Sequence, residues 1–96
     1  MEIQALHTKI DKTIQATPGT IVLEDPAGFP RNDSNLYCLG IGDKILWKAQ
    51  KPDPNTLYQR VRISDDGLNL SAYTTGGHAC EIDLRSGKLI SFVGIK

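Results

Sequence analysis

The second half of the chain is a series of short apolar runs separated by very short turns, and this punctuation constrains the fold more than any other feature. Between residues 36 and 95 the runs alternate apolar and polar side chains, and most turns contain a glycine, such as Gly42, Gly67, Gly77 and Gly87. Alternation with a period of two is typical of half-buried strands. Very short turns join antiparallel neighbours. The segment 36–95 is therefore predicted to form an antiparallel β-meander.

The first twenty residues have a different spacing. Ile3, Leu6, Ile10 and Ile14 are separated by three, four and four positions, and a Pro-Gly pair follows. Apolar residues at these intervals lie on one face of an α-helix, and proline and glycine end helices. The spacing predicts a helix over residues 2–16. The expected fold class is α+β: this N-terminal helix packs on a curved antiparallel meander of six or seven strands that approaches a barrel.

The length and charge of the chain limit its organisation and its partners. A chain of 96 residues can build one hydrophobic core, so a single domain over residues 1–96 is expected. Eleven basic residues balance eleven acidic ones without a block of either sign, which argues against nucleic acid as a partner. No run reaches the roughly 18 apolar residues of a membrane helix, and the N-terminal residues lack the pattern of a signal peptide. We therefore expect a cytoplasmic protein without a membrane segment.

The two cysteines give no sign of a metal site. Cys38 and Cys80 lie inside strand-like runs and lack the short Cys/His spacings that bind zinc. The expected state is two buried free thiols in a reducing compartment, with a disulfide between them as the alternative. Neither a metal nor a cofactor is expected.

The loop over residues 25–35 is the first candidate site. It contains two prolines and concentrates polar and charged side chains, among which Arg31 and Asp33 are candidate binding residues. Long loops on a small scaffold often carry binding residues. The alternative is that the prolines only stiffen the connection between the helix and the sheet.

The polar face of the predicted sheet is the second candidate site. Tyr58 and Arg60 share one side of their run, and Tyr73 occupies the corresponding side of the next run. Tyrosine and arginine are enriched at binding hot spots, so these residues, together with Tyr37, are candidates for a partner surface. The alternative is a set of solvated side chains without a partner.

His78 is the third candidate, because it shares strand parity with Cys80 and follows two glycines. A histidine beside a cysteine suggests a base and a nucleophile. Asp83, which would orient such a pair, has the opposite parity and projects to the other face of the strand. We therefore expect no catalytic residue and keep His78 as a binding candidate.

The last strand-like run is apolar on both faces. Leu89, Val93 and Ile95 fall on one side, whereas Ile90 and Phe92 fall on the other. Such a strand either lies in the centre of a sheet or packs against another chain. The expected partner is another protein or a second copy of this chain, bound through the C-terminal strand. A small ligand stays an alternative.

Two hairpins, over residues 36–48 and 80–92, resemble the repeats of quinoprotein-type β-propellers. The first contains Leu-Tyr-Cys-Leu, a glycine turn and Leu-Trp47, and the second contains Ile-Asp-Leu followed by a Ser-Gly-Lys turn. Lys44 and Lys88 are 44 positions apart, a spacing that matches one propeller blade. The resemblance implies blade-like hairpins, and a closed propeller of about four or more blades would need several copies of the chain.

The order of helix, loop and meander is similar to that of small bacterial accessory proteins of mobile gene cassettes and toxin-immunity families. This resemblance implies a binding role and no chemistry. The sequence therefore predicts a non-catalytic binding or protein-interaction module of immunity or accessory type. The alternative is a small enzyme or ligand-binding protein with its site at the 25–35 loop or around His78.

Overall fold

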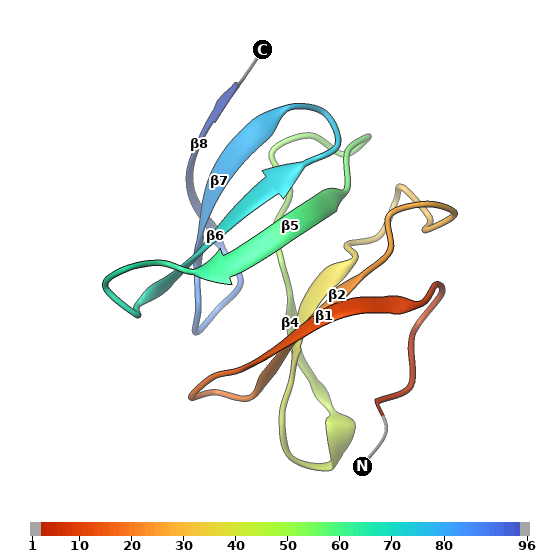
Figure 1. Cartoon of the computed structure of the whole chain (residues 1–96), viewed down its shortest axis with the longest axis vertical. Coiled ribbons are helices and arrows are strands. Elements are labelled where there is room, and N and C mark those ends of the chain that lie inside the picture. Colours follow the sequence, from red (N-terminus) through yellow and green to blue (C-terminus); the bar gives the residue numbers. More distant parts are fainter. Residues whose placement is uncertain (1–2, 95–96) are drawn as a thin grey trace.

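The computed structural model describes residues 3–94 and consists of two antiparallel sheets (Figure 1). The first sheet contains β1 (Ile10–Gln15), β2 (Thr20–Glu24), β3 (Leu36–Leu39) and β4 (Ile45–Lys48). The second sheet contains β5 (Tyr58–Ile63), β6 (Asn69–Thr74), β7 (His78–Asp83) and β8 (Leu89–Gly94). A 3-10 turn, η1 (Ile41–Asp43), precedes β4. Each strand pairs with its neighbour in the chain, so each sheet is a four-stranded meander.

The helix expected over residues 2–16 is wrong, and with it the α+β fold class. Residues 10–15 form β1, residues 3–9 have no regular secondary structure, and residue 2 lies outside the described residues. Ile10 and Ile14 are four positions apart, a spacing that suits one face of a strand as well as one face of a helix. The β-branched residues Ile10, Thr13 and Ile14 favour the strand. Pairing with β2 then supplies the backbone partners that a helix would have found within itself.

A β-bulge in β1 places its apolar side chains in two different environments. The register between β1 and β2 shifts between Ile10 and Lys12. Ile10 packs on the outer face of the first sheet, whereas Ile14 packs on the core between the two sheets. A bulge inserts one extra residue and so changes which face the following side chains occupy.

The single meander of six or seven strands is also wrong, because β4 and β5 do not pair. Residues 49–57, which include Pro52 and Pro54, carry the chain from the first sheet to the second. Proline cannot donate to a strand ladder, so this segment interrupts the meander. The two sheets share one hydrophobic cluster, and the strands in residues 3–94 form two separate ladders that do not close into a barrel.

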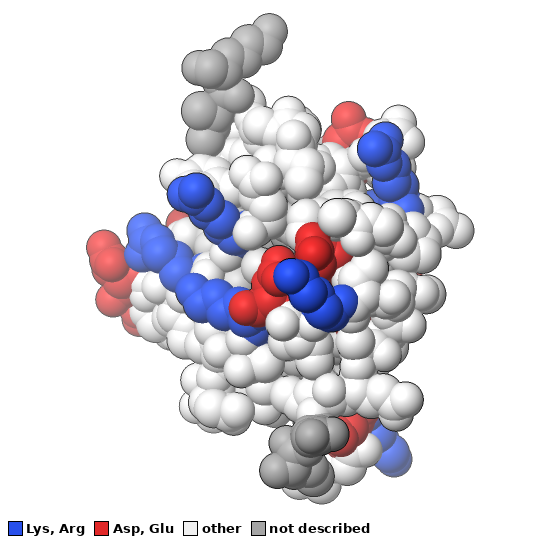
Figure 2. All heavy atoms as spheres, turned by 45° about the vertical axis from the view of Figure 1, so that its right-hand side comes forward, with Lys and Arg blue, Asp and Glu red and all other residues white. Residues whose placement is uncertain are grey.

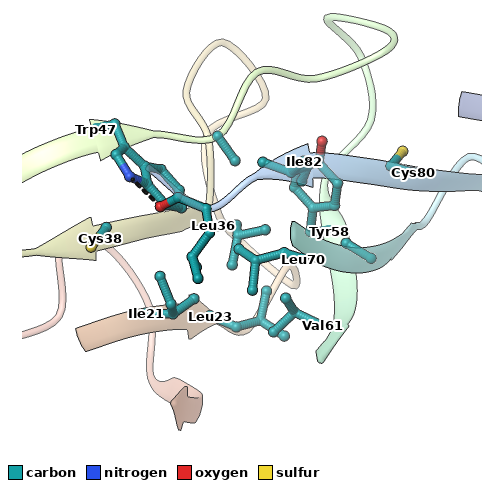
Figure 3. Close-up of a cluster of buried hydrophobic side chains, with 13 residues drawn as sticks. Ile21, Leu23, Leu36, Cys38, Trp47, Tyr58, Val61, Leu70, Cys80 and Ile82 are labelled. Carbon is teal, nitrogen blue, oxygen red and sulfur yellow. Dashed lines mark hydrogen bonds between the residues drawn. The ribbon is translucent and has the colours of Figure 1, made fainter. Parts of the chain in front are cut away.

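One hydrophobic cluster joins the sheets (Figure 3). It takes alternate residues from the strands of both sheets, and it consists of Ile21, Leu23, Leu36, Cys38, Trp47, Ala49, Tyr58, Val61, Leu70, Ala72, Cys80, Ile82 and Leu84. The alternation predicted for the second half of the chain is therefore confirmed in the second sheet, whose cluster residues are Tyr58, Val61, Leu70, Ala72, Cys80, Ile82 and Leu84. Leu68 is outside this cluster and lies exposed in the turn between β5 and β6.

Trp47 of the first sheet packs on the turn between β7 and β8. Its indole Nε1 donates a hydrogen bond of 3.1 Å to the carbonyl oxygen of Leu84. Gly87 lies against the ring, and a Cβ at this position would be 2.5 Å from Cε3 of Trp47. Gly87 also has a φ of +74°, a conformation that favours glycine. The turn therefore requires glycine for its backbone and for the tryptophan contact.

Replacing Gly87 with alanine is expected to lower the free energy of unfolding by about 3 kcal/mol, since the new methyl group displaces the indole. Gly67 is a matched control, because it has a φ of +72° and no atom within 4 Å of its Cβ position. Gly67→Ala is expected to cost only about 1 kcal/mol. Urea unfolding of the two variants measures the difference, and equal losses would contradict the role of the Trp47 contact.

A fully buried asparagine joins the first sheet to β5. The Nδ2 group of Asn35 donates to the carbonyl oxygens of Glu24 and Tyr58, at 2.7 and 2.6 Å. Its Oδ1 accepts the backbone N–H of Tyr58 at 2.8 Å. The side-chain amide of Asn35 thus makes the backbone hydrogen bonds that a neighbouring strand would make at the start of β5. This junction sets how the second sheet is placed on the first.

Candidate functional site

Glu24 is a fully buried charge whose role is to fasten the N-terminal segment. Its carboxylate accepts the backbone N–H groups of Leu6, His7 and Thr8 at 2.6, 3.0 and 3.0 Å, and it also accepts the Tyr37 hydroxyl. Burial by itself raises the pKa of Glu24, but these donors outweigh burial and hold the pKa below its ordinary value. Because every donor comes from the protein itself, this carboxylate is structural.

The loop over residues 25–35 is bound to its own scaffold. Lys48 Nζ donates to both carboxylate oxygens of Asp33, at 2.9 and 3.0 Å. Lys51 Nζ donates to the carbonyl oxygens of Arg31 and Asp33, at 2.5 and 2.9 Å. Phe29 anchors the loop in the interior. The carboxylate of Asp33 is therefore already paired, and the side chain of Arg31 is exposed at the rim of the protein.

The candidate tyrosines Tyr37 and Tyr58 lie in the interior, and both are fully buried. The hydroxyl of Tyr58 donates to the carbonyl oxygen of Gln50 at 2.5 Å. A β-bulge explains the position of Tyr58, because the register between β5 and β6 shifts between Tyr58 and Arg60. Tyr58 therefore faces the core, while Arg60 stays on the outer face. Neither tyrosine contributes to a surface.

Arg60, Tyr73 and His78 are brought together on the second sheet. Arg60 on β5 lies directly opposite Tyr73 on β6. All three residues line an open hollow of about 380 Å³, together with Gln59. Tyr73 is 45% exposed and borders two further hollows, both of which also include Arg62. We call Arg60, Arg62, Tyr73 and His78 the Tyr73 surface.

The surroundings of His78 and Cys80 do not form a nucleophilic pair. The hydroxyl of Thr74 accepts the backbone N–H of His78 at 3.1 Å and lies 2.9 Å from Nδ1 of its ring. Cys80 is buried, and burial raises the pKa of its thiol, so the thiol is protonated at neutral pH. Asp83 accepts the Ser86 hydroxyl at 2.6 Å within the β7–β8 turn. This carboxylate is therefore engaged in the turn.

Side chains of the first sheet close the free edge of β5. The amide of Asn35 bonds both backbone groups of Tyr58, and Lys12 Nζ donates to the carbonyl oxygen of Val61 at 2.8 Å. The outer edge strands of the first sheet carry charges instead, including Asp11 and Lys12 on β1 and Lys48 on β4. Charged side chains on an edge strand oppose pairing with another chain.

β8 has neither kind of protection. Its residues, Leu89–Gly94, include no charged side chain. Among the described residues, one side chain reaches it by a hydrogen bond, from the backbone N–H of Leu89 to Oε1 of Gln50 at 2.9 Å. Ile90, Phe92 and Val93 are 55%, 48% and 64% exposed. Figure 1 shows β8 on the side of the second sheet that is farthest from the first sheet.

A hollow of about 270 Å³ crosses the second sheet and reaches β8. It is lined by Ser91, Phe92 and Val93 of β8 and extends to Tyr73 and Arg62 across the outer face of the sheet. One hollow therefore connects Tyr73 and Arg62 with β8. Alternation along β5 and β6 predicts which of their residues share a face. The open edge cannot be predicted in this way, because it depends on which strand ends the sheet.

The part of the chain that the structure describes shows neither a metal-binding cluster nor a membrane-spanning helix. Within residues 3–94 no group of three or more His, Cys, Asp or Glu side chains could hold a metal ion, and both cysteines are free. The same residues contain no helix that is long and apolar enough to cross a membrane. Comparison with protein-family models, with curated proteins and with solved structures finds no match. Two four-stranded antiparallel meanders that share one hydrophobic cluster define the class of the protein.

Proposed function

We propose that this protein is a small, non-catalytic interaction module of the cytoplasm, of accessory or immunity type, that binds a strand of another polypeptide along β8. The contrast between the sheet edges carries this proposal. Side chains or charges protect β1, β4 and β5, whereas in the described residues only Gln50 reaches β8. An unprotected edge presents backbone N–H and C=O groups to an incoming strand.

The chemistry of the open edge favours an extended, apolar partner. Added strands gain affinity from backbone hydrogen bonds and specificity from pockets for alternate side chains. Ile90, Phe92 and Val93 would pack against the partner, and the hollow between Val93 and Tyr73 would receive one of its side chains.

A second copy of the chain offers a partner with this chemistry in its own β8. Two copies would pair antiparallel about a two-fold axis, which closes the assembly at a dimer. Pairing of one short strand buries less surface than the roughly 1,200 Å² of a stable interface, so the dimer is expected to be weak.

Sedimentation velocity tests self-association. The wild-type protein is expected to form dimers at concentrations on the order of 10⁻⁴ M and to dissociate on dilution. Val93→Lys is expected to weaken dimerisation at least tenfold, because it places a charge on the apolar edge. Leu68→Lys is the matched control, since Leu68 is similarly exposed, at 69% against 64% for Val93, but lies in the β5–β6 turn.

A synthetic peptide with the sequence of residues 88–94 tests strand addition to β8 separately from dimerisation of the protein. Amide NMR shifts confined to β8 and the adjoining hollow would support the proposal, even if the protein itself stays monomeric. A monomer at all concentrations together with no peptide-dependent shift would contradict it.

A further inference from the structure

A second groove lies at the other edge of the second sheet, where β1 approaches β5. It has a volume of about 470 Å³, within the size range of small-molecule sites. Its apolar lining comes from Leu23 and Val61, and Tyr73 stands at its border with the outer face of the sheet. The lining of this groove reaches no residue of β8, although Arg62 and Tyr73 also line the hollow that extends to β8.

Three basic side chains and one acidic side chain line this groove: Lys12, Arg60, Arg62 and Asp11. The ammonium group of Lys12 is held at β5 by its hydrogen bond to the Val61 carbonyl oxygen. Arg60 and Arg62 flank Val61 in the sequence. The groove therefore carries three basic side chains against one acidic side chain, although the whole chain has a net charge of zero.

The charges of this groove are not neutralised by the protein. Among the described residues, neither Arg60 nor Lys12 has a carboxylate oxygen within 4.0 Å. Arg62 approaches Asp65 at 3.6 Å, but the side chain of Asp65 is fully exposed, and such pairs contribute little. An oxyanion bound in the groove would balance these charges, and arginine offers paired donors that match carboxylate and phosphate.

Tyr73 adds an aromatic wall to the same groove. It lies directly opposite Arg60 in the β5–β6 register and is nearly half exposed. A planar ligand ring can pack on tyrosine and on a guanidinium plane. Figure 2 shows basic side chains across one face of the protein with acidic ones beside them, which is not the continuous basic stripe of a nucleic-acid site.

We infer that the groove between β1 and β5 binds a small aromatic oxyanion, in which a phosphate or carboxylate group is attached to a planar ring. The oxyanion lies among Lys12, Arg60 and Arg62, and the ring packs on Tyr73. Carboxylate and phosphate ligands share this chemistry and are distinguished by titration.

Titration of the full chain with phenyl phosphate, benzoate, inorganic phosphate and phenol, followed by amide NMR, tests the inference. Phenyl phosphate or benzoate is expected to bind most tightly, with shifts at β5 and Lys12. Arg60→Gln is expected to weaken this binding about tenfold. Arg31→Gln, which removes an exposed arginine on the 25–35 loop, is expected to leave it unchanged.

Tyr73→Leu tests the contribution of ring packing separately from that of the basic side chains. This variant is expected to weaken phenyl phosphate several-fold and to leave inorganic phosphate unchanged. Equal affinities of the wild-type protein for phenyl phosphate and inorganic phosphate would overturn the aromatic part of the inference. Absence of saturable shifts, or equal losses in Arg60→Gln and Arg31→Gln, would overturn the site itself. The outcome for Arg60→Gln does not depend on whether β8 binds a strand, because Arg60 does not line the hollow that extends to β8.

Discussion

Replacing Asn35 with alanine is expected to lower the free energy of unfolding by about 4 kcal/mol. The substitution leaves the carbonyl oxygen of Glu24 and both backbone groups of Tyr58 without their partner. A buried polar group without a partner costs about 1–3 kcal/mol. Urea unfolding followed by the fluorescence of Trp47, the only tryptophan, measures the loss.

The control for this variant is Asn32→Ala, in the same loop. Asn32 is exposed, so its replacement is expected to change the free energy of unfolding by less than about 0.5 kcal/mol. A loss near 1 kcal/mol for Asn35→Ala would contradict the role of the asparagine as the junction between the sheets. It would mean that water replaces the amide at the start of β5.

Replacing Glu24 with glutamine is expected to lower the free energy of unfolding by about 3 kcal/mol at neutral pH. Glutamine keeps one acceptor oxygen but turns an NH₂ group toward backbone N–H donors of Leu6, His7 and Thr8. Hydrogen bonds to a buried charge contribute about 1.5–3 kcal/mol each, and only some are lost. The N-terminal segment should then separate from the first sheet, which hydrogen exchange of residues 6–8 would detect.

The difference in stability between the wild type and Glu24→Gln is expected to depend on pH. The pKa of Glu24 is lower in the folded state than its ordinary value of 4.5. Its carboxylate therefore contributes stability in full above the unfolded pKa, and this contribution is lost as the pH falls through the folded pKa. The stability difference between the wild type and Glu24→Gln should be constant above about pH 5.5 and should shrink below pH 4.5.

Glu81→Gln provides the comparison, because Glu81 lies on the polar outer face of the second sheet and bonds only to side chains there. Its replacement should have little effect on the free energy of unfolding at neutral pH. A difference between wild type and Glu24→Gln that stays the same from pH 7 to pH 3 would contradict the charged state of Glu24.

The candidate site was predictable only in part. Arg60 and Tyr73 were placed on one face because alternation along neighbouring strands is a local property, and the register confirms that they are opposite each other. Lys12 was missed, since it is 49 positions from Val61 and no local pattern connects them. The sequence around Tyr37 and Tyr58 does not indicate that these tyrosines are buried.

The sequence by itself determined the strands from β3 onward, because period-two alternation and glycine turns act over a few residues. Only the tertiary structure decided the rest. Pairing with β2 made residues 10–15 a strand, β1. The residues before β1 are held by hydrogen bonds to Glu24. The bulges at Asp11 and Gln59 then moved side chains between faces, and the division into two sheets left β8 as an open edge. These outcomes depend on contacts between distant residues, which compete with local propensities and outweigh them.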